Sequence, residues 1–305
     1  MAKPASGMSV LPLPALALVL NAFVWGVSWW PFRQLQSLGL HPLWATALVY
    51  LVSMALLLAL RPRAWQDFAN QPLLWLLMAA AGMTNVGFNW AVTVGDVVRA
   101  VLLFYMMPAW TVILAWPLLG EKPSATSLLR LALAMAGVVI VLKTPQTPWP
   151  VPQSLPDWLA LMGGFSFALT NILLRKLHRV DAAPRILAMF AGGAGLAVAA
   201  GLIGSAAGQV PALPVPQWEW APMGLILSLG FLASNVALQY GASRMGAHAA
   251  ALIMLSEVVF ASWSSVALGA AQMNARTWIG GLLILAAAVW SAWPDSAPTP
   301  ASRTQ

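Results

Sequence analysis

Long apolar runs, cut by short stretches of proline, glycine and charged residues, follow one another along the whole chain. Ten such runs fall at about 11–31, 42–60, 72–93, 98–119, 125–143, 156–176, 184–204, 221–241, 247–270 and 277–293. A helix that crosses about 30 Å of hydrocarbon needs about 20 mostly apolar residues. The pattern therefore predicts an all-α integral membrane protein with ten transmembrane helices.

The composition supports a lipid environment. Of the 305 residues, 60% are hydrophobic and 8% are charged, whereas about 25% charged residues is typical of soluble domains. Ten spans leave no room for a separate soluble domain, and the net charge of +7 indicates basic cytoplasmic loops rather than a nucleic-acid partner. The absence of cysteine from the sequence excludes disulfides and thiolate metal sites.

The distribution of Lys and Arg predicts the orientation in the membrane. If the N-terminus is cytoplasmic, four of these residues lie outside, at Arg33, Arg99, Lys143 and Arg276. The other eleven then lie inside: Lys3, Arg61, Arg63, Lys122, Arg130, Arg175, Lys176, Arg179, Arg185, Arg244 and Arg303. Because cytoplasmic loops carry an excess of positive residues, we expect both termini in the cytoplasm.

The two halves of the chain are related. At a shift of 142 residues Arg33 aligns with Arg175, and at a shift of 150 residues 84–86 (TNV) align with 234–236 (SNV). We expect a first five-helix repeat at 1–143, a proline-rich linker at 144–155, a second repeat at 156–293 and a disordered cytoplasmic tail at 294–305. Each repeat has an odd number of helices, so the second is inverted. Inverted repeats with a site between them are typical of secondary transporters.

Amide side chains recur at matching positions of the two halves. Asn85 and Asn89 share one face of the third predicted helix, and Asn235 and Gln239 share the equivalent face of the eighth. One interpretation is that they line a central cavity and bind a polar substrate. The alternative is hydrogen bonding between helices, worth about 0.6–2 kcal/mol per contact in a membrane.

Glu257 lies deep in the ninth predicted span, and no other carboxylate lies near the middle of a span. An ionised, unpaired carboxylate is costly in hydrocarbon, so Glu257 is protonated, paired or in contact with water. It is a candidate for proton coupling or for contact with a substrate ammonium group. A structural hydrogen bond to a neighbouring helix is the alternative.

Several aromatic residues fall within predicted spans rather than at their ends. Most membrane tryptophans lie at the two interfaces, so aromatic residues in mid-span are candidates for the wall of a cavity. Packing against lipid is the alternative for each of them. The candidates are Trp25, Trp90, Tyr105, Trp110 and Tyr240.

Enzymatic functions find little support. The three histidines have no metal-ligand spacing, no nucleotide-binding Walker sequence occurs, and no serine has an evident general base. We therefore expect neither a metal nor a cofactor. An intramembrane lipid-modifying enzyme is the alternative from another class, and it requires a catalytic pair in one cavity.

Several short motifs occur along the chain in a fixed order: Trp25-Gly26, residues 100–111 (AVLLFYMMPAWT) leading to 119–123 (LGEKP), 136–139 (AGVV), and residues 249–259 in the second half. In these motifs the chain resembles the EamA branch of the drug/metabolite transporter superfamily. The chain departs from the family pattern at Val258, where many members have proline, and at Ala271, which aligns with Glu121.

The resemblance implies an exporter of amino acids or related metabolites in a bacterial inner membrane. Within the family, the chain most resembles aromatic amino-acid exporters. The expected partners of the protein are a small-molecule substrate and the lipid bilayer, and no obligate protein partner is inferred. We expect facilitated export by alternating access. The alternative within transport is a proton-coupled multidrug or cation exporter that uses Glu257.

Overall fold

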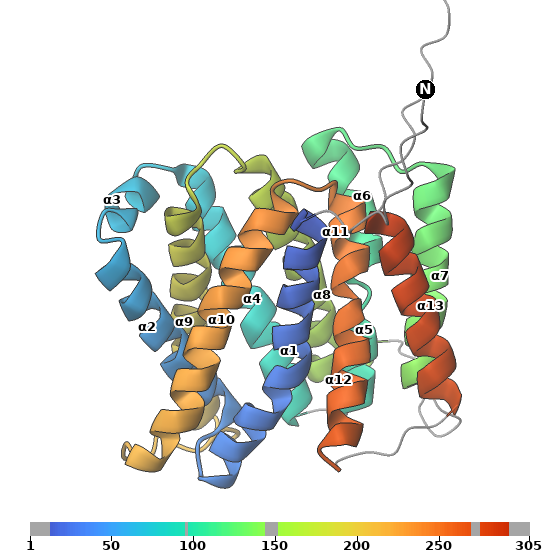
Figure 1. Ribbon diagram of the computed structural model, residues 1–305. Coiled ribbons are helices and arrows are strands. Elements are labelled where there is room, and N and C mark those ends of the chain that lie inside the picture. Colours follow the sequence, from blue (N-terminus) through green and yellow to red (C-terminus); the bar gives the residue numbers. More distant parts are fainter. Residues whose placement is uncertain (1–12, 95–96, 144–151, 270–274, 293–305) are drawn as a thin grey trace, which may run out of the picture.

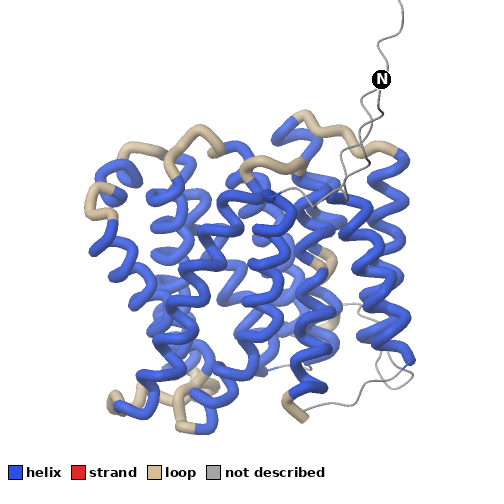
Figure 2. The backbone as a smooth tube through the Cα atoms, in the orientation of Figure 1, coloured by secondary structure: helices blue, strands red, loops and turns tan. Residues whose placement is uncertain are grey.

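The computed structural model describes residues 13–94, 97–143, 152–269 and 275–292. Every regular element in these ranges is a helix, and the helices run roughly side by side with their connections at two opposite ends (Figures 1 and 2). The predicted tail at 294–305 and most of the predicted linker at 144–155 lie outside the described residues. The prediction of an all-α architecture is confirmed for the described part of the chain.

The helices follow the apolar runs of the sequence closely. Six described helical segments are long and apolar enough to cross a membrane, and shorter apolar helices accompany them. The elements are α1 (Leu13–Ser37), α2 (Pro42–Leu60), α3 (Ala64–Ala69), α4 (Pro72–Val94), α5 (Val97–Phe104), α6 (Met107–Leu119), α7 (Ala125–Leu142), α8 (Leu155–Lys176), α9 (Ala182–Ala206), the 3-10 helix η1 (Trp218–Trp220), α10 (Ala221–Ala242), α11 (Ala247–Met254), α12 (Ser256–Ala267) and α13 (Ala275–Ala292).

Local sequence explains where several helices begin. Pro42 starts α2, where its missing N–H is not needed, and the backbone N–H of Leu43 donates to Nδ1 of His41 at 3.3 Å. Burial lowers the pKa of His41 and so favours the neutral ring, which can accept this bond. At α8 the carboxylate of Asp157 accepts from the backbone N–H of Ser154 at 3.2 Å.

Two of the predicted spans are broken in the structure. The run at 98–119 forms α5 and α6, which are separated at Tyr105 and Met106, and the run at 247–270 forms α11 and α12, which are separated at Leu255. Pro108 in the first turn of α6 accounts for the first break, because proline has no N–H and cannot continue a helix from its N-terminal side. The second break contains no proline.

Close backbone contacts at glycines join the helices. In the middle of the bundle α4 packs against α8 and α9, while α1 packs against α10 and α12. Gly82 of α4 meets Gly192 of α9 so closely that a Cβ atom on either would collide with the other helix. At one edge α13 packs on α7 (Figure 1), where a Cβ on Gly137 would lie 2.7 Å from the carbonyl oxygen of Gly280. Small residues permit such close helix contacts in membranes.

Candidate functional site

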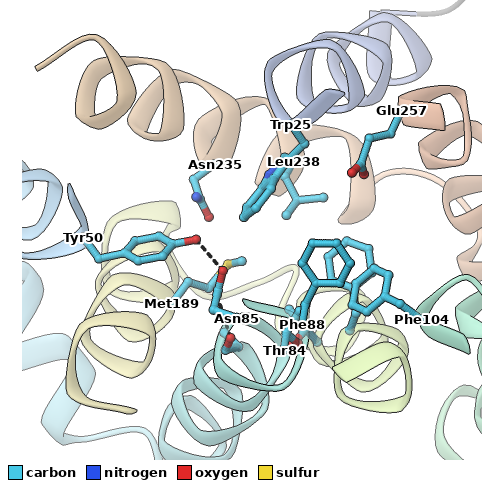
Figure 3. A pocket seen from close by; sticks show the side chains of 13 residues that line it. Trp25, Tyr50, Thr84, Asn85, Phe88, Phe104, Met189, Asn235, Leu238 and Glu257 are labelled. Carbon is cyan, nitrogen blue, oxygen red and sulfur yellow. Dashed lines mark hydrogen bonds between the residues drawn. The ribbon is translucent and has the colours of Figure 1, made fainter. Parts of the chain in front are cut away.

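A cavity of about 50 Å³ lies inside the bundle, where the two broken helices approach α1, α2, α4, α8, α9 and α10. Figure 3 shows the side chains that converge on it from different helices. The lining residues are Trp25, Tyr50, Ala81, Thr84, Asn85, Phe88, Phe104, Phe167, Thr170, Met189, Asn235, Leu238 and Glu257.

Polar side chains cover one side of the cavity. The hydroxyl of Tyr50 donates to Oδ1 of Asn85 at 2.7 Å, and Nδ2 of Asn85 donates to the backbone oxygen of Ala81 at 2.8 Å (Figure 3). Nδ2 of Asn235 donates to the backbone of its own helix, and its Oδ1 has no hydrogen-bond partner among the described residues. Oγ1 of Thr170 is also buried and has no hydrogen-bond partner among the described residues. Unpaired buried acceptors are costly, so this side of the cavity favours a ligand with hydrogen-bond donors.

Aromatic rings form much of the remaining wall. Trp25 stacks on Phe231 with ring centroids 4.6 Å apart and planes 24° from parallel. The rings of Phe88 and Phe104 are 4.7 Å apart, and Phe167 stacks on Phe104 at 5.9 Å. Contacts of this kind hold large apolar side chains in fixed orientations. The wall is therefore suited to a flat apolar group.

Glu257 supplies the charge of the cavity. It lies in the first turn of α12, two residues after the break at Leu255, and its carboxylate points into the cavity (Figure 3). The hydroxyl of Tyr105 hydrogen-bonds to this carboxylate. The positive end of the α12 helix dipole also stabilises a negative charge there. No Lys, Arg or His is among the lining residues, so within the described chain the cavity presents a carboxylate without a cationic partner in its wall.

Comparison with known proteins assigns the family. The chain matches the EamA-like transporter family over two segments, residues 12–143 and 154–293. It belongs to the EamA-like transporter family. Relatives that it matches in part are named as transport proteins.

Individual relatives of this EamA-like transporter are distant. It is 25% identical over 63% of its length to a probable transport protein of Saccharomyces cerevisiae, and 30% identical over 41% to an uncharacterized transporter of Pseudomonas aeruginosa. It is also 25% identical over 51% to the protein RarD of Streptomyces exfoliatus. The matched part spans about half the length of these curated relatives, at 59%, 41% and 49%.

A solved crystal structure shares the fold of this EamA-like transporter. The two superpose with a TM-score of 0.75 at 16% identity, over 92% of this chain and 98% of the other. At that identity the likeness concerns the fold alone. It extends over nearly the whole of both chains.

The structure brings together four of the residues that the sequence suggested. Trp25, Asn85, Asn235 and Glu257 line one cavity, although they come from α1, α4, α10 and α12. Tyr105 lies behind the wall, where it contacts Glu257. Substrate binding by these residues remains a proposal.

The other two predicted amides, Asn89 and Gln239, lie one helical turn after Asn85 and Asn235. Nδ2 of Asn89 donates to Oγ1 of Thr46 at 2.7 Å, which connects α4 to α2. Nε2 of Gln239 lies 3.1 Å from the sulfur of Met189, which connects α10 to α9. Neither is among the lining residues. Their positions match the alternative interpretation, hydrogen bonding between helices.

Besides Tyr105, three of the predicted aromatic residues are not among the lining residues. The ring of Trp110 packs edge-on against Phe165 at 5.7 Å, and Trp90 lies beside Gly204 of α9. The guanidinium of Arg244 covers the ring of Tyr240 at 4.1 Å, close to the end of α10. These contacts are packing and interface contacts.

Sequence reasoning missed most of the aromatic wall and its polar neighbours. Tyr50, Phe88, Phe104, Phe167, Thr84 and Thr170 all line the cavity. Each sits in an apolar run where phenylalanine, threonine and tyrosine are ordinary residues. Phe88 had one available signal, because it lies three residues after Asn85 and so shares its helix face.

Proposed function

We propose that this protein exports small amphipathic metabolites, neutral and above all aromatic amino acids, by alternating access. The observation that carries this proposal is the composition of the cavity wall: aromatic rings, two amides and one carboxylate in the interior of a membrane transporter. The membrane is a bacterial inner membrane, and both termini face the cytoplasm, as the excess of Lys and Arg in the corresponding loops indicates.

Ten spans in two inverted halves, 1–143 and 156–293, would provide the alternating access. The two segments matched by the family support this division. So do the two broken helices: α5 ends at Phe104 and α11 ends at Met254, which are 150 residues apart, the same separation as Asn85 and Asn235. Broken helices at the interface of inverted repeats are a common design for transporter sites.

The substrate would lie with its ammonium group at Glu257 and its side chain between Trp25, Phe88 and Phe104. Asn85 and Asn235 would hydrogen-bond to its remaining polar groups. The present volume of about 50 Å³ is a third of the roughly 150 Å³ that holds a benzene ring in an engineered protein cavity. A metabolite therefore requires the cavity to expand, which agrees with a site that opens and closes during transport.

We favour facilitated transport. A second candidate, a proton-coupled cation exporter, is favoured by one observation: among the described residues, no cationic side chain lines the cavity to receive a substrate carboxylate. For that function Glu257 would bind a proton and a cationic substrate in alternation. The two candidates differ in whether a carboxylate on the substrate is tolerated.

Transport by purified protein in proteoliposomes tests both candidates. Labelled phenylalanine, tyrosine, tryptophan and methionine are compared with lysine, with phenethylamine, and with a quaternary ammonium dye, each with and without an imposed pH gradient. Phenethylamine matches phenylalanine except for the carboxylate. Saturable uptake of the neutral amino acids without a gradient supports the main proposal. Movement of only the amine and the dye, and only with a gradient, supports the cation exporter.

A further inference from the structure

A second charged cluster lies outside the cavity, at the end of the bundle where α1 begins (Figure 1). Glu121 follows α6, in the connection to α7. Its Oε2 accepts a 3.0 Å hydrogen bond from the backbone N–H of Ala247, the first residue of α11. Its Oε1 lies 3.6 Å from Nε of Arg175, near the end of α8. We call Glu121, Arg175 and the α11 N-terminus the latch.

The latch joins the two segments that match the family. Glu121 belongs to the segment 12–143, whereas Arg175 and Ala247 belong to the segment 154–293. Arg175 is fixed on its own side as well, because its Nη1 donates to the backbone oxygen of Ser243 at 2.9 Å, just after α10. One carboxylate thus connects the α6–α7 turn to α8 and α11. If the halves separate at this end of the bundle, these contacts must break.

The latch also has a direct mechanical connection to the cavity. It holds the first residue of α11, and α11 ends at Met254, three residues before Glu257. An eight-residue helix is about 12 Å long. Because α11 is separated from α12 by the break at Leu255, it can tilt as a short rigid rod. Movement of its outer end would therefore reposition the backbone beside Glu257.

The exposure of the pair suits a contact that opens repeatedly. The side chain of Arg175 is 34% exposed and that of Glu121 is 28% exposed. Water can therefore solvate both charges as soon as they separate, which keeps the pair weaker than a fully buried one. The positive end of the α11 dipole adds a further attraction to Glu121.

We propose that the latch is the gate of this transporter on the cytoplasmic side. Glu121 and Arg175 are positioning residues: they hold α11 against the α6–α7 turn while the cavity is closed to the cytoplasm. Release of Glu121 frees α11 and opens the cavity to that side. This role presupposes the alternating-access cycle proposed above, but not the identity of the substrate.

Thiol labelling tests the gate directly, because the chain contains no cysteine. Thr170 lines the cavity, so Thr170→Cys places one thiol there. A membrane-impermeant thiosulfonate is then added to the cytoplasmic or the opposite face of oriented membranes. In the Glu121→Gln background, which keeps the side-chain shape, we expect labelling from the cytoplasmic face to be about fivefold faster or more, and labelling from the opposite face to be slower.

Matched control variants distinguish opening of the gate from a general loosening of the protein fold. Glu219→Gln removes an exposed carboxylate remote from the latch, and Lys122→Gln removes a charge next to Glu121 that lies over Trp116 instead. Both should label like the parent. Arg175→Gln should shift labelling in the same direction as Glu121→Gln, and the double variant should shift it by less than the sum of the two.

Equal labelling rates in Glu121→Gln and its parent would overturn the proposed gate. Faster labelling from both faces would also overturn it, because that result indicates a destabilised protein. Size-exclusion profiles and melting temperatures show whether each variant is folded. The labelling needs no substrate. A change in the face from which the thiol is labelled, with no amino-acid transport, would therefore support the gate and reject the proposed substrate. Amino-acid transport with no change in labelling would support the substrate and reject the gate.

Discussion

The hydroxyl of Tyr50 donates a 2.7 Å hydrogen bond to Oδ1 of Asn85, joining α2 to α4 at the wall of the cavity. The Tyr50 ring stacks on Phe231 at 5.7 Å and packs against Phe190 at 5.5 Å, so the hydroxyl is held in place by rings from α9 and α10. Asn85 in turn is oriented by its bond to Ala81. The amide that faces the cavity is therefore fixed before any substrate arrives.

Removing this hydroxyl should weaken both stability and transport. Tyr50→Phe keeps the ring contacts but leaves Oδ1 of Asn85 without its donor, at a cost of about 1–3 kcal/mol. We expect a lower melting temperature and a higher KM for the transported amino acid. Tyr240→Phe is the matched control, since the Tyr240 ring lies under Arg244 outside the cavity. Equal effects of the two substitutions would contradict a role for the Tyr50–Asn85 bond.

Neutralising Glu257 should reduce transport without unfolding the protein. Glu257→Gln keeps the shape and an acceptor for Tyr105, but removes the charge that would bind a substrate ammonium group. Hydrogen bonds to charged groups contribute about 1.5–3 kcal/mol, so transport efficiency should fall about tenfold or more. Initial uptake rates over a range of substrate concentrations measure this. Efficiency that matches the Glu219→Gln control would remove Glu257 from the site.

The aromatic wall predicts a graded effect at Trp25. Trp25→Ala removes a ring that lines the cavity, and an aromatic contact between this ring and a substrate ring would contribute about 0.5–1.5 kcal/mol. The KM for aromatic substrates should rise about two- to tenfold, and Trp25→Phe should restore part of the affinity. Trp263, which is 57% exposed on α12, provides the control. A similar rise in KM for Trp263→Ala would indicate that the effect is not specific to the cavity.

Helix packing predicts a contrast between two glycines on α9. A Cβ on Gly192 would collide with the backbone oxygen of Met78 on α4, whereas one on Gly195 would meet nothing within 4 Å. Gly192→Ala should destabilise the protein by about 1–3 kcal/mol or more, because the two helices must move apart. Gly195→Ala should leave the melting temperature unchanged or raise it slightly. Equal melting temperatures would show that α4 and α9 are not in close contact there.

The positions of most long helices could be predicted, because a long apolar run is visible in the sequence itself, whereas the short α3 (Ala64–Ala69) and the last turns of α1 were not predicted. Pro42, Pro72 and the serine before α7 mark helix starts within one or two residues of the predicted ones. The break between α5 and α6 also has a local signal in Pro108. The break at Leu255 has none, since Val258 occupies the equivalent position and the apolar run continues through it.

The site was less predictable because sequence spacing does not decide which face of a helix meets the cavity. Asn85 and Asn89 share one face of α4, yet only Asn85 lines the cavity, while Asn89 reaches Thr46 of α2. The same holds for Asn235 and Gln239 on α10. One helical turn thus separates a cavity residue from a packing residue. The unusual residue Glu257 could be identified from the sequence, because a carboxylate in mid-span needs an explanation.

We propose that the substrate passes through the cavity lined by Trp25, Asn85, Asn235 and Glu257. The most direct measurement is uptake of labelled phenylalanine by proteoliposomes that contain the Thr170→Cys variant, before and after treatment with a small thiosulfonate and again after reduction. The cysteine-free parent serves as the control. We predict that modification abolishes uptake, that excess phenylalanine slows the modification, and that reduction restores uptake. Unchanged uptake through a fully modified protein would show that the substrate does not pass through this cavity.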